Sequence, residues 1–207
     1  MSEGFYDRHI LPYLIDFSCG RKDIRRERDK VVPRAEGRVL EVGIGTGLNL
    51  AHYDKSRVER VVGVDPAETM HRLAQKRAAR AGIAVELVCL SAERLPLADA
   101  SFDSVLVTYS LCTIPDPVAA LREMRRVLKP GGHLLFCEHG RSPDEGVRRW
   151  QERLQPVWGP LAGGCHLGRD IPAILREGGF ESRDLGTGYI RGPRFLTYHY
   201  WGSAQPA

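Results

Sequence analysis

The chain has 207 residues, of which 43% are hydrophobic and 27% are charged, and its formal net charge is +4. This length suits one globular domain with a full hydrophobic core, so we expect a single domain over residues 1–207. The small positive charge gives no electrostatic reason to expect a nucleic-acid or membrane partner, and we expect a small molecule instead.

The five cysteines are odd in number, widely spaced and without a CxxC pair. This usage does not indicate a disulfide framework and favours a reducing, cytoplasmic setting. Asp7, Arg8, His9 and Pro12 interrupt the N-terminal stretch, and no other window approaches ~18 uninterrupted apolar residues. We therefore expect no signal peptide and no membrane span, while the oligomeric state stays open.

Short apolar runs rich in β-forming residues then alternate with segments of helical period. The apolar runs are RVLEV, RVVGVD, AVELVCL, FDSVLVTYS and HLLFCEH, and the helical segments are residues 48–53, 67–81 and 117–128. This alternation is typical of βαβ units on a buried parallel sheet. KPGG, residues 129–132, has the Pro and Gly residues of a turn before the next strand.

The pattern changes after His139, where we expect a helix over residues 144–154, a Gly-rich loop and a short helix that ends at residue 177. FESRDLGTGYI and PRFLTYHYWG then alternate like two paired strands, which predicts one sheet of about seven strands with a final hairpin. Residues 140–178 would form an insertion on the substrate side, and residues 1–36 an N-terminal helical cap. Within that cap, the basic run over residues 20–30 is expected to be a solvated helix face.

The stretch VLEVGIGTGLNL, residues 39–50, leads from an apolar run through three glycines to a helical segment. Glycines permit a sharp turn and the close approach of a ligand, and the following helix directs free N–H groups at it. A dinucleotide fingerprint needs a small residue where Leu48 stands. Glu41 would repel a pyrophosphate but favour a ligand that bears an ammonium and a sulfonium. The loop therefore favours S-adenosylmethionine as the ligand. The alternative hypothesis, a nicotinamide-dependent dehydrogenase, is disfavoured.

Asp65 ends the second expected strand, eighteen residues after Gly47. A carboxylate at this place can accept both hydroxyls of a ribose. The alternative is a helix N-cap, with Pro66 at the first helical position. The third strand leads into LSAERLPL, where a short polar side chain and a backbone N–H can read the edge of an adenine.

Together, EVGIGTG, VVGVDPAETM, SAERLPLADASFDSVLV and RVLKPGG resemble the motif series of class I S-adenosylmethionine-dependent methyltransferases. The resemblance implies an α/β fold with a Rossmann-like, doubly wound seven-stranded sheet, mostly parallel with an antiparallel last strand. It also implies S-adenosylmethionine as the cofactor. Ser91 departs from the family pattern, in which many members carry Asp, so the adenine contact could pass to Glu93 or to the Ala92 amide. The residues expected to hold the cofactor are Glu41, Gly43, Gly45, Gly47, Asp65, Pro66, Ser91, Ala92, Glu93 and Thr108.

A narrower resemblance lies outside this common core. SLCTIPD, CEHG, WQERLQPVW and GGCHLGRD are similar to segments of the animal thiol methyltransferases of the methyltransferase-like family, which methylate small thiols, including hydrogen sulfide. The resemblance implies a thiol acceptor, but not those enzymes' hydrophobic membrane anchor, so only peripheral membrane contact stays open. Similar bacterial chains also resemble phospholipid N-methyltransferases. Phosphatidylethanolamine or a small N-, O- or C-acceptor is therefore a rival, and a non-catalytic S-adenosylmethionine-binding module is a further alternative.

Methyl transfer is an in-line displacement in which alignment and the exclusion of water matter most, and a strong general base is optional. The segments TYSLCT and EHG follow two expected strands at the edge of the sheet where ligands lie. The residues expected at the acceptor or in catalysis are Tyr109, Cys112, Glu138, His139, Cys165 and His166. The cysteines can also be small buried hydrophobes, and His139 can bond backbone at a strand end.

No metal is expected from the sequence. Cys137, His139, Cys165 and His166 offer ligand atoms, but CxH followed by CH lacks the spacing of the usual zinc sites.

Overall fold

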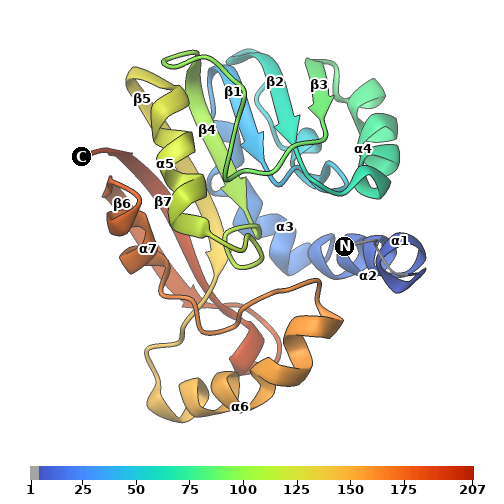
Figure 1. Ribbon diagram of the computed structural model, residues 1–207, viewed down its shortest axis with the longest axis vertical. Coiled ribbons are helices and arrows are strands. Elements are labelled where there is room, and N and C mark those ends of the chain that lie inside the picture. Colours follow the sequence, from blue (N-terminus) through green and yellow to red (C-terminus); the bar gives the residue numbers. More distant parts are fainter. Residues whose placement is uncertain (1–4) are drawn as a thin grey trace.

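The computed structural model describes residues 5–207, which form one seven-stranded sheet flanked by helices (Figure 1). The strand order is β3-β2-β1-β4-β5-β7-β6, and β7 runs antiparallel to both of its neighbours. The expected Rossmann-like α/β sheet and its final hairpin are thereby confirmed. The strands are β1 Gly37–Val42, β2 Val58–Val64, β3 Ala84–Val88, β4 Phe102–Thr108, β5 Leu128–His139, β6 Phe180–Tyr189 and β7 Tyr198–Pro206.

Some helices cover the faces of the sheet, and others lie beyond the carboxyl ends of its parallel strands. Figure 1 places α1, α2, α3 and α6 beyond the ends to which the arrows of the parallel strands point. None of the helices in the described residues is both long and apolar enough to cross a membrane. The α-helices are α1 Phe5–His9, α2 Leu11–Cys19, α3 Lys22–Asp29, α4 Glu68–Ala81, α5 Pro117–Val127, α6 Glu145–Leu161 and α7 Ile171–Glu177, and the 3-10 turns are η1 Val32–Arg34, η2 Leu48–Ala51 and η3 Arg194–Leu196.

The expected cap over residues 1–36 therefore contains α1–α3 and η1, but its first four residues lie outside the described part of the chain. The expected insertion over residues 140–178 contains α6 and α7. Both boundaries stay predictions.

Both faces of the central strands are buried, which explains why the strands read as continuous apolar runs. Leu40 of β1 packs in one core cluster with Leu121 of α5 and Leu175 of α7. Its neighbour Val39 packs in a second cluster with Val32 of η1 on the opposite face, because successive strand residues point to opposite sides. This double burial fixes the strand ends that carry the polar loops.

Helix α6 differs from the expected helix over residues 144–154, because it continues to Leu161 through Pro156 and Pro160. Proline removes a backbone hydrogen bond and normally ends a helix. Here side chains of the second half bond the loop that follows: Gln155 Nε2 donates to the Cys165 carbonyl at 3.0 Å, and Gln155 Oε1 accepts from the Leu167 N–H at 2.7 Å. These long-range bonds hold the part of α6 that the sequence did not indicate.

Two further expected elements differ locally. The KPGG segment, residues 129–132, is not a turn ahead of the strand but a bulge within β5, because the pairing shifts from Phe102–Leu128 to Ser104–His133. The expected helix over residues 48–53 is only the short 3-10 turn η2. Neither difference changes the order of the elements.

A substitution at Phe136 tests the central core. Phe136 is fully buried in β5, and its register partners in the neighbouring strands are Val107 and Gly202. We expect Phe136→Ala to lower the free energy of unfolding by about 3–5 kcal/mol, because it leaves a cavity among packed side chains. Denaturant unfolding followed by circular dichroism measures this change. The matched control is Phe17→Ala, which removes a side chain that is 78% exposed and should change the value by less than about 0.5 kcal/mol. Equal losses in the two variants would contradict this core.

Candidate functional site

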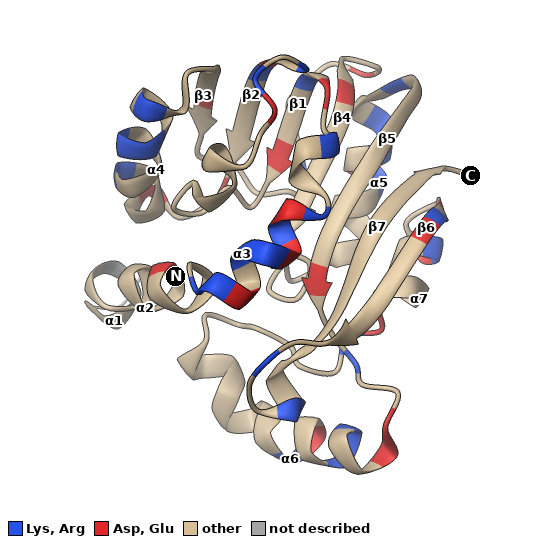
Figure 2. Ribbon diagram, turned by 180° about the vertical axis from the view of Figure 1, so that it is seen from behind, with Lys and Arg blue, Asp and Glu red and all other residues tan. Residues whose placement is uncertain are grey.

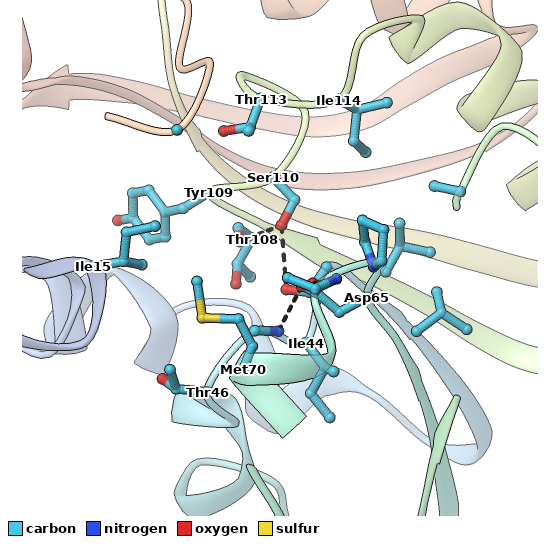
Figure 3. Close-up of a pocket in the computed structure, with 18 of the residues that line it drawn as sticks. Ile15, Ile44, Thr46, Asp65, Met70, Thr108, Tyr109, Ser110, Thr113 and Ile114 are labelled. Atoms are coloured by element: carbon cyan, nitrogen blue, oxygen red, sulfur yellow. Dashed lines mark hydrogen bonds between the residues drawn. The ribbon is translucent and has the colours of Figure 1, made fainter. Parts of the chain in front are cut away.

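A cavity of about 450 Å³ opens where β1, β2 and β4 end. Its volume lies in the range of ~300–1,000 Å³ that is usual for small-molecule sites. The sheet order changes direction between β1 and β4, and ligands of doubly wound sheets bind at this switch point. Figure 3 shows Tyr109 and Ile15 on one side of the cavity and Asp65 on the other.

The glycine loop after β1 forms the floor of the cavity. Gly43 has φ +70°, and a Cβ there would lie only 2.0 Å from Ser110 Oγ, so a side chain would collide with the loop after β4. Gly45 has φ +53°, and a Cβ there would meet no atom closer than 3.9 Å. Gly45 lines the cavity, so the missing side chain leaves room for a ligand beside the backbone.

Asp65 at the end of β2 lines the cavity and also holds the glycine loop. Its Oδ2 accepts a hydrogen bond from the Gly45 N–H at 3.0 Å, and its Oδ1 accepts one from the Ala67 N–H at 2.9 Å (Figure 3). The N-cap of α4 is Ala67 rather than Asp65, and Pro66 lies before the cap instead of inside the helix. The structure thus corrects the N-cap alternative, and both Asp65 and Pro66 face the cavity.

The far end of the cavity lies at the segment after β3, where Ser91, Ala92 and Glu93 line it as the sequence indicated. The Ser91 hydroxyl donates to the Glu93 carboxylate, and Glu93 also accepts from the Asp116 N–H at 3.4 Å. A polar side chain and backbone amides are therefore present at this end, and their contact with an adenine stays a prediction.

Glu41 and Gly47 are not among the residues that line the cavity, and the contact with the cofactor that was expected of them stays a prediction. Glu41 lies beneath the loop, where it accepts hydrogen bonds from Tyr53 Oη at 2.7 Å and Asn49 Nδ2 at 2.9 Å. Because successive residues of β1 alternate between its faces, Val42 reaches the cavity and Glu41 does not. Burial raises the pKa of Glu41 to about 7, although these hydrogen bonds oppose the shift.

Arg28 lines the cavity and was missed by the sequence interpretation. Helix α3 is rich in charge (Figure 2), and Lys22, Arg25, Arg26 and Asp29 form the exposed face that was expected. Glu27 and Arg28 are buried, however, and the Arg28 residue is only 4% exposed. Its Nη1 donates to Asn49 Oδ1 at 2.9 Å and to Thr108 Oγ1 at 2.6 Å, and its guanidinium lies 4.8 Å from the centre of the Tyr109 ring. Acidic residues interleave with the basic ones in this segment, so no local pattern distinguished the one arginine that turns inward.

Tyr109 is the one expected acceptor-side residue that lines the cavity among the described residues. It has φ +54°, which is rare for a bulky residue and is found where the surrounding structure fixes a functional side chain. Its N–H donates to the Cys137 carbonyl at 2.9 Å, and its hydroxyl accepts from Cys137 Sγ at 3.5 Å. Burial raises the pKa of Tyr109 well above its ordinary value, so the phenol stays protonated near neutral pH. Thr113, in the expected TYSLCT segment, also lines this end of the cavity. The other cavity residues at this end, which sequence reasoning missed, are Leu11, Ile15, Cys19, Ile114 and Gly163.

Comparisons with known proteins agree with this geometry. Residues 40–136 match the family described as "Methyltransferase domain". Over 188 aligned residues the chain is 36% identical to thiol S-methyltransferase TMT1B of Homo sapiens, a match that covers 84% of this chain and 76% of that protein. The chain belongs to the S-adenosylmethionine-dependent methyltransferases.

Two further comparisons set limits on this assignment. Thiol S-methyltransferase TMT1B of Rattus norvegicus is 37% identical over 151 residues, which cover 71% of this chain but only 61% of the rat protein's length. A solved S-adenosylmethionine-dependent methyltransferase of Thermotoga maritima, described as a possible histamine N-methyltransferase, superimposes with a TM-score of 0.68 at 24% identity and covers 97% of each chain. At this identity the comparison supports only the fold of the present chain, not its substrate.

Glu138 positions the loop that carries Tyr109 and does not itself line the cavity of the methyltransferase. It is fully buried, and its Oε1 accepts hydrogen bonds from the Ser110 N–H at 2.9 Å and the Leu111 N–H at 3.1 Å. Burial raises the pKa of Glu138 to about 7, although the two backbone bonds oppose the shift. In the structure Glu138 supports the turn after β4, and the catalytic role expected of it stays a prediction.

Cys112, His139 and Cys165 gather behind the cavity wall rather than in the cavity. Cys165 Sγ lies 3.1 Å from His139 Nε2, and the Trp158 Nε1–H donates to the same sulfur at 3.2 Å. Burial alone would lower the pKa of His139, but its hydrogen bond and charge interaction with Cys165 raise it above the ordinary value. Hydrogen bonding to Cys112 and burial raise the pKa of the Cys165 thiol.

The side chains of His166 and Cys137 stay outside this group. The His166 N–H donates to the Cys112 carbonyl at 2.8 Å, while burial and the nearby Arg169 lower the pKa of the His166 ring. Cys137 bonds Tyr109 instead. The four residues weighed as metal ligands from the sequence are therefore not brought together. Cys112, His139 and His166 do not line the cavity, and the catalytic roles expected of them stay predictions.

Glu138→Gln tests the buried carboxyl through the pH dependence of stability. The folded-state pKa is about 7 against an ordinary value of 4.5, so the proton is bound more tightly in the folded protein. Its stabilising contribution is full below pH 4.5 and is lost as the pH rises towards 7, at up to ~1.4 kcal/mol per pH unit. We expect the variant's free energy of unfolding to fall less steeply than the wild type's over this window.

Denaturant unfolding at a series of pH values measures this slope. Glu41 retains its own titration in the variant, so the slope should shrink rather than disappear. Identical slopes in the two proteins would show that Glu138 does not take up the proton.

Proposed function

We propose that this protein transfers a methyl group from S-adenosylmethionine to a small thiol, giving a methyl thioether. Support comes from the two relatives named thiol S-methyltransferases and from the chemistry of the cavity. We call the end of the cavity near Tyr109, Thr113 and Ile15 the acceptor end. The thiol preference rests on this end, where the described lining side chains include no carboxylate and no histidine.

The residues that line the cavity fit the cofactor. Gly45 leaves space where a Cβ would project, Asp65 offers a carboxylate to the ribose hydroxyls, and the Ser91–Glu93 segment offers polar groups to the adenine. The buried Arg28 guanidinium supplies the positive charge that complements the α-carboxylate of the methionine part. Bound S-adenosylmethionine supplies an electrophilic methyl group on its sulfonium.

The lack of a base at the acceptor end favours an acceptor that ionises without help. A thiol with a pKa near ~8.5 is partly a thiolate at neutral pH, whereas an alkylamine with a pKa near ~10.4 is almost wholly protonated and not nucleophilic. Tyr109 stays protonated and so acts by packing and hydrogen bonding rather than as a base. Alignment of the acceptor then does most of the catalytic work.

The N-terminal helices help to exclude water from this end. Leu11 and Ile15 of α2 line the cavity, and a Cβ on Gly163 would lie 3.1 Å from Leu11 Cδ2, so helix and loop are in close contact. The Tyr6 hydroxyl donates to the Leu161 carbonyl at 2.7 Å, which joins α1 to α6. A dry site strengthens the electrostatic interactions of the reacting groups. As part of the same proposal we place the protein in a reducing, cytoplasmic setting, which suits five free cysteines.

Asp65→Ala tests the cofactor site. We expect it to weaken the binding of S-adenosylhomocysteine by at least about tenfold, because it removes the acceptor for the ribose hydroxyls and the bond that holds Gly45. Isothermal titration calorimetry measures the affinity. The control Asp99→Ala removes an exposed carboxylate that pairs with Arg126 away from the cavity, and should bind as the wild type does. Wild-type affinity in Asp65→Ala would remove the basis for this cofactor site.

An acceptor panel tests the reaction itself. With methyl-labelled S-adenosylmethionine, we expect label in small thiols but not in amines, phenols or phospholipid vesicles, and a rate that rises with pH as the thiol ionises near ~8.5. Scintillation counting of the separated products measures transfer, with Asp65→Ala as the inactive control. Label in the lipid alone would replace the proposal by phospholipid N-methylation. Tight cofactor binding with no labelled product would instead indicate a non-catalytic binding module.

A further inference from the structure

Cys112, His139 and Cys165 come from three separate segments: the loop after β4, the end of β5 and the loop between α6 and α7. Their sulfur and nitrogen atoms all lie within 4.8 Å of one another, and they are the one such group among the described residues. Both cysteines are free thiols and both are buried. We propose that these three residues form a zinc-binding site with two thiolates and one imidazole.

The spacing of the three atoms is close to what zinc requires. Zn–S bonds of ~2.3 Å and Zn–N bonds of ~2.0 Å in a tetrahedron separate the ligand atoms by about 3.5–3.8 Å. Cys165 Sγ and His139 Nε2 are 3.1 Å apart, and no pair in the group exceeds 4.8 Å. Shifts of up to about one ångström, within the range of a side-chain rotation, would therefore admit the ion.

The choice of metal follows from the ligands. Thiolate and imidazole together are ligands for zinc, whereas magnesium and calcium take oxygen. Three protein ligands leave one tetrahedral position, which suits a water molecule or an added thiol. The long separations along the chain explain why no zinc pattern is visible in the sequence, since each ligand is supplied by a different element.

The surroundings hold the group in place. Trp158 Nε1–H donates to Cys165 Sγ at 3.2 Å, and an N–H donor of this kind stabilises a sulfur that carries negative charge. The Gln155 side chain fixes the Cys165 carbonyl, and the His166 N–H fixes the Cys112 carbonyl at 2.8 Å. The two cysteines are thus oriented by bonds that do not involve the sulfurs themselves, as a preformed metal site requires.

A zinc ion here would join the segments that wall the cavity. Thr113, next to Cys112, and Gly163, two residues before Cys165, both line the cavity. The inference goes beyond the proposed reaction, because zinc binding can be measured without cofactor or acceptor.

The test uses the reduced full chain with any affinity tag removed. After dialysis against a chelator and back into buffer, titration with zinc chloride should show about one tight site per chain, and cobalt(II) chloride should give thiolate charge-transfer bands with the intense visible bands of a tetrahedral ion. Zinc should raise the melting temperature, since it binds the folded state. Absence of both a tight zinc site and the cobalt bands in the wild type would overturn the inference.

Variants assign the ligands. Cys112→Ser, His139→Gln and Cys165→Ser should each weaken zinc binding by more than about 100-fold, because the loss of a ligand costs more than the loss of its supporting bonds. The control Cys89→Ser alters an exposed cysteine whose Sγ donates to the Pro66 carbonyl, and should bind zinc normally.

Two further outcomes bear on the site. Zinc binding by all four variants would place the ion elsewhere and overturn the site. If a ligand variant does not fold, alkylation of the wild type decides: zinc should protect Cys112 and Cys165 but not Cys89, and equal labelling with and without zinc would overturn the inference. Loss of methyl transfer with zinc binding intact would affect the proposed function alone.

Discussion

The guanidinium of Arg28 is almost fully removed from water, and a buried charge has to be paired within the protein. It bonds Asn49 and Thr108, and Asn49 in turn donates to Glu41 under the glycine loop. One network thereby ties helix α3, strand β1, turn η2 and the end of strand β4 together. Loss of Asn49 or Thr108 would leave a buried guanidinium N–H without an acceptor, which costs about 1–3 kcal/mol. The floor and one wall of the cavity depend on this network.

The order of strands and helices could be predicted from the sequence because it depends on burial along single segments. RVLEV and RVVGV are apolar on both faces, and the glycine loop has a local conformational requirement that only glycine meets readily. The continuation of α6 through Pro156 and the bulge at residues 129–132 depend on partners outside those segments, Cys165 and Leu167 for the first and β4 for the second. The local sequence pattern of a segment does not show which other parts of the chain it will contact.

The candidate site divides in the same way. The place of Gly43, Gly45 and Asp65 beside the cavity could be predicted because their chemistry is local to a strand end, and all three line it. Arg28 was missed because its segment has the composition of a solvated helix. The sequence correctly placed the residues after β4 and β5 beyond the carboxyl ends of these strands. It did not show which of them reach the cavity. Only the packing shows that Tyr109 faces the cavity while Glu138 lies beneath its loop.

This packing also changes what the motifs shared with thiol methyltransferases mean. Cys112, His139 and Cys165 belong to those motifs, yet they lie behind the wall rather than in the cavity. The wall residues Thr113 and Gly163 belong to the loops that carry the two cysteines, so anything that fixes the cysteines also fixes the wall. Since a thiol needs no base, a cavity end without carboxylate or histidine is consistent with selection by shape.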